Sequence, residues 1–356
     1  MSFYFFYYDI INLSGDIMKV LLYFEKQKQI KQSGIGRALS HQKKALELAN
    51  VDYTLDPKEE FDFAHVNTYF NESMKLIKKC KKNKKIIIAH GHSTKEDFKY
   101  SFRLWRLVQP FYNRYILRLY RSADAIITPT EYSKSLISKY KGVNCPIYAI
   151  SNGIMLEDYV YKDENVKAFD DLFKLPKDQK IVICAGLYFE RKGIRDFFEI
   201  ARKMPDVTFI WFGHLNKTLT QLKILRAIKK RPKNVLMPGY VDIKVLRGAF
   251  HRANCFLFLS HEENEGIAVL EAMASKLPVI VRDIPVFNPW LKDNEHVLKG
   301  KNNEEFIEKL NYIFNNDMSN MTDNAYKVVE ERTLDKIGAQ IKEVYERVYN
   351  KNSGTK

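Results

Sequence analysis

Two short apolar runs, joined by an acidic loop and a helical segment, constrain the fold of this chain more than any other feature. Residues 254–260 (NCFLFLS) and 277–281 (LPVIV) have the length and apolar content of buried strands. Between them, residues 261–275 read HEENEGIAVLEAMAS, in which an acidic loop leads into strong helix formers. A strand, a loop, a helix and a second strand form one unit of a parallel sheet. Ligands bind to such units beyond the carboxyl ends of the strands, where a helix N-terminus attracts anions such as phosphate.

Two carboxylates in this unit stand eight residues apart. Glu263 belongs to the loop and Glu271 to the helix, so both can face one ligand. Together with the EAMA sequence, this spacing resembles the E-x7-E signature of the retaining family 4 glycosyltransferases. The resemblance implies that Glu263 contacts the donor sugar, that Glu271 binds the ribose and that Gly266 lets backbone amides approach the diphosphate. The family has Gly and Phe where this chain has Asn264 and Glu265. The alternative is an ordinary amphipathic helix with acidic residues near its N-terminus.

The rest of the chain alternates apolar runs with helical segments and predicts two domains. A length of 356 residues with 46% hydrophobic side chains can fill two cores. The family resemblance implies the GT-B arrangement, an α/β fold with two Rossmann-like domains facing a central cleft. We expect an N-terminal extension at residues 1–17, an acceptor-binding domain at 18–165, a nucleotide-sugar-binding domain at 166–330 and a C-terminal helix at 331–356 that returns to the first domain. The polar, charged stretch 161–180 is the expected linker.

Two segments of the first domain are candidates for the donor site. A glycine-rich turn enters a helix at Gly34 and Gly36, and such a turn can hold a phosphate. It lacks the G-x-G-x-x-G spacing of NAD-binding proteins because Leu39 stands at the last position. A predicted strand ends near His90 and His92, where catalytic groups of parallel sheets lie. The resemblance implies that the glycines lie at the donor diphosphate and that His92, with His90 as second choice, lies near the donor sugar. A structural role for both histidines is the alternative.

Basic residues after the first strand of the second domain supply the charge that a leaving diphosphate needs. Residues 185–193 read AGLYFERKG, similar to the family motif G-R-L-x-x-x-K-G. The resemblance implies that Gly186, Arg191 and Lys192 bind the donor, with Arg191 compensating for Leu187 at the usual Arg position. Fixed cations stabilise the negative charge that grows on the diphosphate as the glycosidic bond breaks. A solvated Arg–Lys pair is the alternative.

The same resemblance indicates the donor and the reaction. Gly239 and Tyr240 stand in a segment whose backbone meets the nucleobase in the family, and the expected donor is UDP-glucose or UDP-galactose. His92, Glu263 and Lys192 are the expected catalytic residues of a same-face transfer that retains the anomeric configuration. The chain contains no D-x-D sequence, whose carboxylates would hold a divalent ion at the diphosphate. We therefore expect that the reaction requires no metal and no other cofactor.

The formal net charge of +15 is concentrated in residues 71–121. This stretch has nine Lys and five Arg against three acidic residues, which predicts a polyanionic partner. Within it, residues 97–121 combine cations with aromatic side chains such as Phe98 and Phe102, as interfacial helices do, and we expect helix on both sides of Pro110. The alternative is a helix pair whose aromatic side belongs to the core and whose basic side is only solvated. The expected membrane- and acceptor-binding residues are Lys99, Arg103, Trp105, Arg106, Arg114 and Arg118.

These observations give one expected function and two alternatives. The chain is expected to be a hexosyltransferase that moves a sugar from a UDP-sugar to a diacylglycerol-type membrane glycolipid, forming a diglycosyl-diacylglycerol. The HSTKEDF sequence at 92–98 is similar to bacterial enzymes of that kind. No apolar run approaches the roughly 20 residues of a membrane span, so we expect peripheral attachment to an anionic membrane surface, on the cytoplasmic face of the cell membrane. One alternative is a transferase acting on a polyprenyl-linked or teichoic-type polymer. The other is a basic nucleic-acid-binding protein, which the absence of RNA-binding and zinc-finger motifs disfavours; we expect no nucleic-acid partner.

Overall fold

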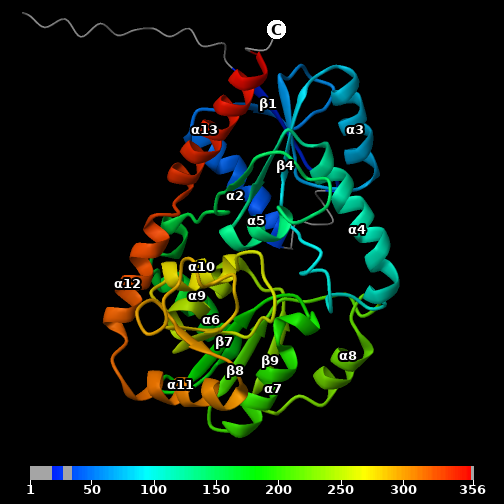
Figure 1. Cartoon of the computed structure of the whole chain (residues 1–356). Coiled ribbons are helices and arrows are strands. Elements are labelled where there is room, and N and C mark those ends of the chain that lie inside the picture. Colours follow the sequence, from blue (N-terminus) through cyan, green and yellow to red (C-terminus); the bar gives the residue numbers. More distant parts are fainter. Residues whose placement is uncertain (1–17, 27–33, 354–356) are drawn as a thin grey trace, which may run out of the picture.

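The N-terminal half of the chain builds the upper sheet of Figure 1. The computed structural model describes residues 18–26 and 34–353, so the expected N-terminal extension at 1–17 lies outside the described residues. Six parallel strands form the sheet in the order β2-β1-β3-β4-β5-β6. They are β1 (Lys19–Tyr23), β2 (Asp52–Thr54), β3 (Phe63–Val66), β4 (Ile86–His90), β5 (Ala125–Thr128) and β6 (Ile147–Ala149). We call this sheet and the helices packed on it the first domain.

The strands of this sheet are continuous apolar runs because helices cover both of its faces. One face packs against α2 (Gly34–Leu48), and the other packs against α3 (Asn71–Lys82) and α4 (Trp105–Ser122). The helix α5 (Glu131–Ile137) follows β5. β4 ends at His90, so the next few residues lie at the carboxyl edge of the sheet.

The second domain repeats this plan with a sheet in the order β12-β11-β10-β7-β8-β9, again parallel. Its strands are β7 (Ile181–Ala185), β8 (Thr208–Phe212), β9 (Val235–Gly239), β10 (Cys255–Phe258), β11 (Val279–Arg282) and β12 (Leu298–Gly300). Its helices are α6 (Asp163–Phe173), α7 (Ile194–Lys203), α8 (Leu222–Lys229), α9 (Ile243–Arg252), α10 (Ile267–Ala274), α11 (Asn303–Asn315) and α12 (Ser319–Glu330). The predicted fold class, two α/β domains each with a parallel sheet, is confirmed.

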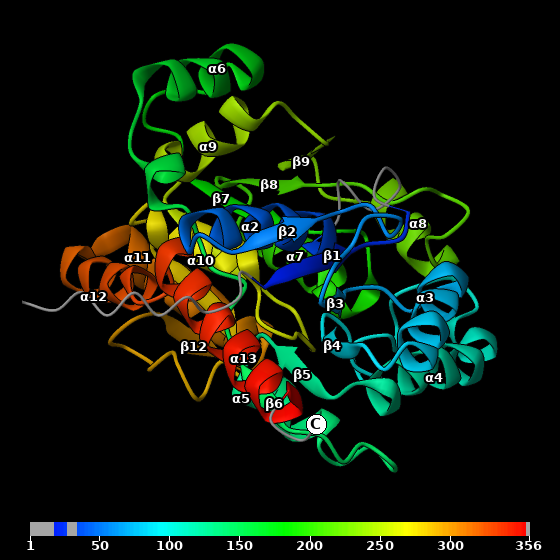
Figure 2. The ribbon, with the colours of Figure 1, turned by 90° about the horizontal axis from the view of Figure 1, so that it is seen from above.

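The linker predicted at 161–180 is wrong, because this stretch contains the helix α6. Figure 2 shows α6 beside α9 at one end of the molecule, and Phe169 of α6 is fully buried in the second core. A side chain at Gly248 of α9 would overlap the Asn165 carbonyl, so the two helices cross in close contact. Two acidic residues in the first turn, Asp163 and Glu164, stabilise the helix N-terminus and gave the stretch its polar appearance.

The helix predicted before Pro110 is also wrong in part. α4 begins only at Trp105, and Tyr100 and Leu104 have left-handed backbone angles, with φ of 58° and 59°, that interrupt any helix before it. Lys99 and Arg103 therefore belong to a turn rather than to a helical stripe. Phe98 and Phe102 face inward: the Phe102 ring lies 4.8 Å from that of Phe189 in the second domain.

The last helix, α13 (Leu334–Ser353), runs back along the first domain (Figure 1). Its apolar residues Leu334, Ile337 and Ile341 are buried in the first-domain core. A side chain at Gly338 would overlap the Ala45 carbonyl of α2, so glycine allows the two helices to touch. The chain thus crosses between the domains twice.

Candidate active site

Lys192 and Glu263 form a buried ion pair near the place where the two domains meet. Lys192 ends the 3-10 turn Glu190–Lys192 that follows β7, and Glu263 lies in the loop that follows β10. The Lys192 ammonium contacts Glu263 Oε1, and the Arg191 guanidinium lies 3.5 Å from the same oxygen. Burial by itself raises the pKa of Glu263, but the two cations outweigh it and hold the pKa below its usual value. Glu263 is therefore ionised at neutral pH.

Two glycines allow the loops that carry Lys192 and Glu263 to pack closely. Gly193, directly after Lys192, has a φ of +77°, and a side chain there would overlap the Leu259 carbonyl at the end of β10. Gly186 follows β7, and a side chain there would lie 3.7 Å from Cδ of Lys192. The lysine stem therefore runs along the backbone at Gly186, which places two of the predicted donor-binding residues side by side.

Arg191 extends the cationic group toward the first domain. Its Nη1 donates to the Glu262 carbonyl over 2.7 Å, and its Nε donates to Ser101 Oγ over 2.8 Å. The Arg191 side chain is only 11% exposed, so this cation is largely shielded from solvent. The Arg191 side chain therefore contacts residues of both domains.

His92 contributes an imidazole from the first-domain side, two residues after β4. Its Nε2–H donates to Asn67 Oδ1 over 2.7 Å, and its ring stacks on His90 with centroids 3.9 Å apart. Burial lowers the pKa of His92 to about 3, so the ring is neutral and its Nδ1 is an acceptor. His90 is buried beneath the His92 ring, and its Nδ1 forms a hydrogen bond of 2.6 Å with Gln42 Nε2. These contacts suit a residue with a structural role.

Asn264 joins His92 to the Glu263 loop. Its Nδ2 donates to the His92 carbonyl over 2.9 Å and to Asp97 Oδ2 over 2.5 Å. Its backbone carbonyl accepts a hydrogen bond from Thr130 Oγ1 over 2.8 Å. Through these contacts the three predicted catalytic residues, His92, Glu263 and Lys192, come together at one junction. Their roles in catalysis stay predictions.

Glu265 makes a second connection between the domains. Its Oε2 accepts hydrogen bonds from the backbone N–H and the side chain of Asn152, over 3.1 and 2.6 Å, and its Oε1 accepts one from Ser151 Oγ. The carboxyl is buried, and burial raises its pKa even though these donors oppose the shift. Asn264 and Glu265 are the two positions where the loop after Glu263 departs from the family pattern, and both bind the opposite domain.

Glu271, the predicted ribose ligand, is fully buried on α10. Its carboxylate forms an ion pair with the Arg37 guanidinium of α2. Gly34 and Gly36 lie in the first turn of α2, so this pair brings the predicted glycine turn next to α10. A ribose hydroxyl that binds Glu271 would share the carboxylate with Arg37 or replace it.

The remaining donor-binding predictions lie at two places along the second sheet. Gly266 has a φ of +94° and caps the N-terminus of α10, a conformation that favours glycine. Gly239 ends the edge strand β9, separated from β10 by β7 and β8. Tyr240 follows it, 44% exposed, and its hydroxyl donates to the His214 carbonyl over 3.2 Å. A ligand that reached from Tyr240 to Glu263 would extend over the ends of four neighbouring strands, from β9 to β10.

The predicted membrane-binding residues lie on the outside of the first domain. Trp105 is partly buried, with its ring 4.7 Å from that of Tyr100 and the Arg106 guanidinium 5.6 Å from the Trp105 ring centroid. The five cations of the set are all exposed: Lys99, Arg103, Arg106, Arg114 and Arg118.

Two acidic residues beside the site were missed from the sequence. Burial raises the pKa of Asp97 to about 6 and that of Glu262 to about 7, so both carboxyls hold a proton at higher pH than usual. Glu262 accepts a hydrogen bond from Tyr132 of α5 over 3.2 Å. Asp97 follows a predicted site histidine by five residues, which is the only sequence signal that could have indicated it.

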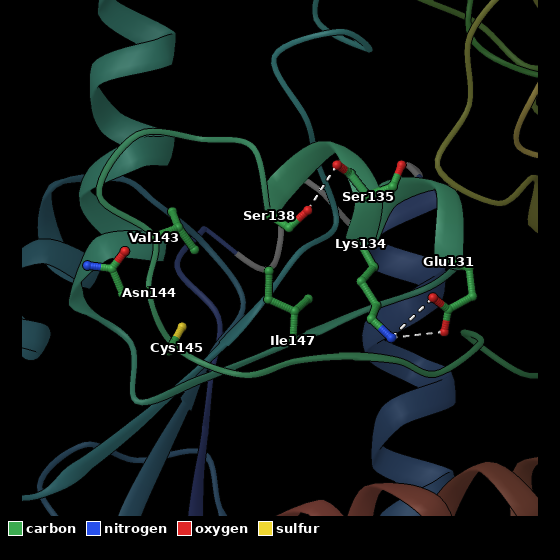
Figure 3. Close-up of a pocket in the computed structure, with 8 residues that line it drawn as sticks. All are labelled: Glu131, Lys134, Ser135, Ser138, Val143, Asn144, Cys145 and Ile147. Atoms are coloured by element: carbon green, nitrogen blue, oxygen red, sulfur yellow. Dashed lines mark hydrogen bonds and ion pairs between the residues drawn. The ribbon is translucent and has the colours of Figure 1, made fainter.

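The described residues include no group of three or more His, Cys, Asp or Glu side chains arranged to hold a metal ion. Among the same residues, no helix combines the length and the apolar character needed to cross a bilayer. Figure 3 shows a surface pocket between α5 and β6, lined by residues from Glu131 to Ile147, where Lys134 pairs with Glu131. None of the predicted site residues lines it, and we assign it no role.

Two parallel sheets of this order, with a carboxylate and two cations at the junction of their domains, define a glycosyltransferase of the GT-B class. The chain belongs to family 4 of the glycosyltransferases: residues 39–158 match the family described as Glycosyltransferase Family 4, and residues 166–328 match Glycosyl transferases group 1.

Relatives and solved structures agree with this assignment. The chain is 51% identical to the processive diacylglycerol alpha-glucosyltransferase of Acholeplasma laidlawii, over 93% of this chain and 98% of that protein. It is 32% identical to the alpha-galactosylglucosyldiacylglycerol synthase of Streptococcus pneumoniae, over 42% of this chain and 40% of that protein. Among solved structures, Alr3699/HepE of Anabaena in complex with UDP-glucose superposes with a TM-score of 0.72 at 14% identity, over 93% of this chain and all of that one. At that identity the likeness shows the fold alone.

Proposed function

We propose that the chain transfers a glucosyl group from UDP-glucose to a diacylglycerol-type lipid at the membrane surface, with retention of configuration. The observation that carries this proposal is the 51% identity, over nearly the full length of both chains, to an alpha-glucosyltransferase that acts on diacylglycerol. The UDP-glucose bound to a protein of the same fold supports the choice of donor. UDP-galactose is the donor that a direct comparison must exclude.

The residues at the domain junction suit this reaction. The bond between the anomeric carbon and the β-phosphate oxygen breaks, a bond to the acceptor oxygen forms on the same face, and the acceptor proton passes to the departing phosphate. Lys192 and Arg191 lie where they could stabilise the charge that develops on that phosphate. The ionised Glu263 keeps Lys192 in place and offers an acceptor to sugar hydroxyls. The neutral His92 offers its Nδ1 to a hydroxyl of the sugar or the acceptor.

Metal independence is part of the proposal. In this proposal Arg191 and Lys192 supply the fixed positive charge that a divalent ion supplies in other transferases. Turnover should therefore persist in excess chelator. A loss of activity in chelator that magnesium restores would contradict this part of the proposal without affecting the rest.

The test is a transfer assay with the purified protein, radiolabelled UDP-glucose or UDP-galactose, and vesicles with diacylglycerol, monoglucosyl-diacylglycerol or neither, followed by thin-layer chromatography. We expect glucolipid products from UDP-glucose only. Lys192→Ala and Glu263→Gln should each lower turnover by about 100-fold or more. Lys192→Ala removes a cation beside the departing diphosphate, and Glu263→Gln removes the carboxylate that holds Lys192 and accepts from sugar hydroxyls. Turnover of both variants within threefold of the unmodified protein would refute the site. Product on a polyprenyl-linked acceptor alone would refute the acceptor.

A further inference from the structure

We propose that the second domain has its own membrane-contacting segment, residues 216–230, which joins α4 of the first domain to form one continuous bilayer-binding surface. The inference rests on the proposed function, since it takes a lipid bilayer as the partner. The membrane-binding residues predicted from the sequence all lie in the first domain, and the proposed surface also includes residues of the second domain.

The first half of this surface is the N-terminal part of α4 and the turn before it. Leu104, Leu107 and Phe111 are 63%, 69% and 67% exposed. Large apolar side chains gathered in one exposed patch mark an interaction site. Residues 98–123 contain six Lys or Arg and no acidic residue, so the stretch that carries these apolar side chains has positive charges only.

The second half lies on α8 and the loop before it. Leu219 and Leu222 are 48% and 49% exposed, whereas Ile224 on the opposite side of α8 is fully buried in the second core. Residues 207–241 contain seven Lys or Arg and no acidic residue, and all seven cations are exposed. The segment therefore has the same composition as the first half: exposed aliphatic side chains bordered by cations.

Hydrogen bonds join the two halves. The Arg103 N–H donates to the Leu219 carbonyl over 2.7 Å, and Gln221 Nε2 donates to the Tyr100 carbonyl over 2.9 Å. Figures 1 and 2 both show α4 and α8 on the same side of the molecule. The leucines at 104 and 219 thus belong to one surface that crosses the boundary between the domains.

The apolar and basic side chains of this surface fit a bilayer that contains anionic lipid. Aliphatic side chains enter the region below the headgroups, and cations beside them contact anionic lipid. A nucleic acid would use the cations, but it binds apolar surface by stacking bases on aromatic rings, and leucines predominate here. Because hydrogen bonds join the two halves across the domain boundary, a bilayer that binds both halves also favours the domain arrangement in which Asn264, next to Glu263, bonds the His92 carbonyl.

The inference is tested by co-flotation of the full-length protein with vesicles of phosphatidylcholine, with and without phosphatidylglycerol. The variant Leu219→Ser with Leu222→Ser should bind vesicles about tenfold more weakly, because it removes two half-exposed apolar side chains from the surface. Its hydrolysis of UDP-glucose in solution should be unchanged, since neither leucine contacts the site. The matched control is Leu172→Ser with Tyr312→Ser, which changes two similarly exposed apolar residues, 52% and 54% exposed, elsewhere on the second domain and should bind like the unmodified protein.

A charge variant gives an independent measurement. Arg226→Gln with Lys229→Gln should weaken binding to vesicles with phosphatidylglycerol and leave binding to neutral vesicles unchanged. Unaltered binding of both second-domain variants, with binding lost in Leu107→Ser with Phe111→Ser, would overturn the inference and leave membrane attachment through the first domain intact. Absence of vesicle binding by the unmodified protein would overturn the inference and the membrane part of the proposed function together. Glycosyl transfer to lipid dispersed in detergent would still test the reaction separately.

Discussion

The Glu265 carboxylate offers a direct measure of how firmly the two domains are held together. It is 3% exposed and accepts three hydrogen bonds from Ser151 and Asn152 in the first domain. Replacing it by alanine leaves those donors without a partner. Each hydrogen bond to a charged group is worth about 1.5–3 kcal/mol, but burial of the carboxylate opposes the sum. We therefore expect Glu265→Ala to reduce the free energy of opening the junction by about 2–4 kcal/mol.

A double-mutant cycle isolates one of these contacts, the hydrogen bond between the Asn152 side chain and Glu265. Asn152→Ala removes the 2.6 Å hydrogen bond and leaves the backbone N–H in place. The coupling energy between Glu265→Ala and Asn152→Ala should be about 1.5–3 kcal/mol if the carboxylate is charged, and nearer 1 kcal/mol if it is protonated. Glu265→Gln is the matched control, because it keeps the volume and one acceptor oxygen.

Hydrogen–deuterium exchange of the peptide that contains residues 150–154 measures this opening. A loss of about 2–4 kcal/mol corresponds to exchange that is roughly 30- to 900-fold faster. A peptide from β1, which lies away from the junction, should exchange unchanged. Exchange of 150–154 within threefold of the unmodified protein, together with a coupling below about 0.5 kcal/mol, would refute the reasoning.

Two further predictions concern stability. Gly338→Ala should lower the free energy of unfolding by about 1–3 kcal/mol in a urea titration, because the new side chain overlaps the Ala45 carbonyl. Gly34→Ala, where no atom of the described residues lies within 4 Å of the new side chain, should change it by about 0.5 kcal/mol or less, and equal effects would contradict the close helix contact. Burial raises the pKa of Asp97 from 3.8 to about 6, so between these pH values the folded protein keeps a proton that the unfolded chain has released, and stability falls as the pH rises through this window. Between pH 4.5 and 7, Asp97→Asn should remove about 2 kcal/mol of that fall, measured by unfolding at the two pH values. The same pH dependence in the variant would show that another group is responsible.

The alternation of apolar runs with helical segments was enough to predict the fold class, because buried parallel strands must be apolar on both faces. It failed at 161–180 and at 97–104 for different reasons. In α6, the acidic residues of the first turn made the stretch read as a polar linker, although Phe169 is buried in the core. Before α4, the aromatic and basic spacing fitted a helix, but inter-domain contacts of Phe102 hold the chain in turns.

The parts of the site that lie in local sequence motifs could be predicted, and the contacts between distant residues could not. Lys192 and Glu263 follow strands of the second sheet, whose strands end at a common edge, and His92 follows a strand of the first sheet, so the edge on which each lies could be inferred from the sequence. The partners of Asn264 and Glu265 could not, because those contacts join residues more than a hundred positions apart. The ion pair between Arg37 and Glu271 is of the same kind, and no pattern around Arg37 indicates it.

The packing of α13 on the first domain affects how the protein folds during its synthesis. Leu334, Ile337 and Ile341 close the first-domain core, so this core remains incomplete until the ribosome has synthesised almost the whole chain. The residues of the second sheet and its helices, from 163 to 330, are contiguous and can fold earlier. During that interval the nascent first domain exposes the apolar face of α2, which makes it a target for chaperones and for aggregation. A premature stop codon at position 334, which removes α13, would therefore leave a chain with one complete domain and one whose core cannot be completed.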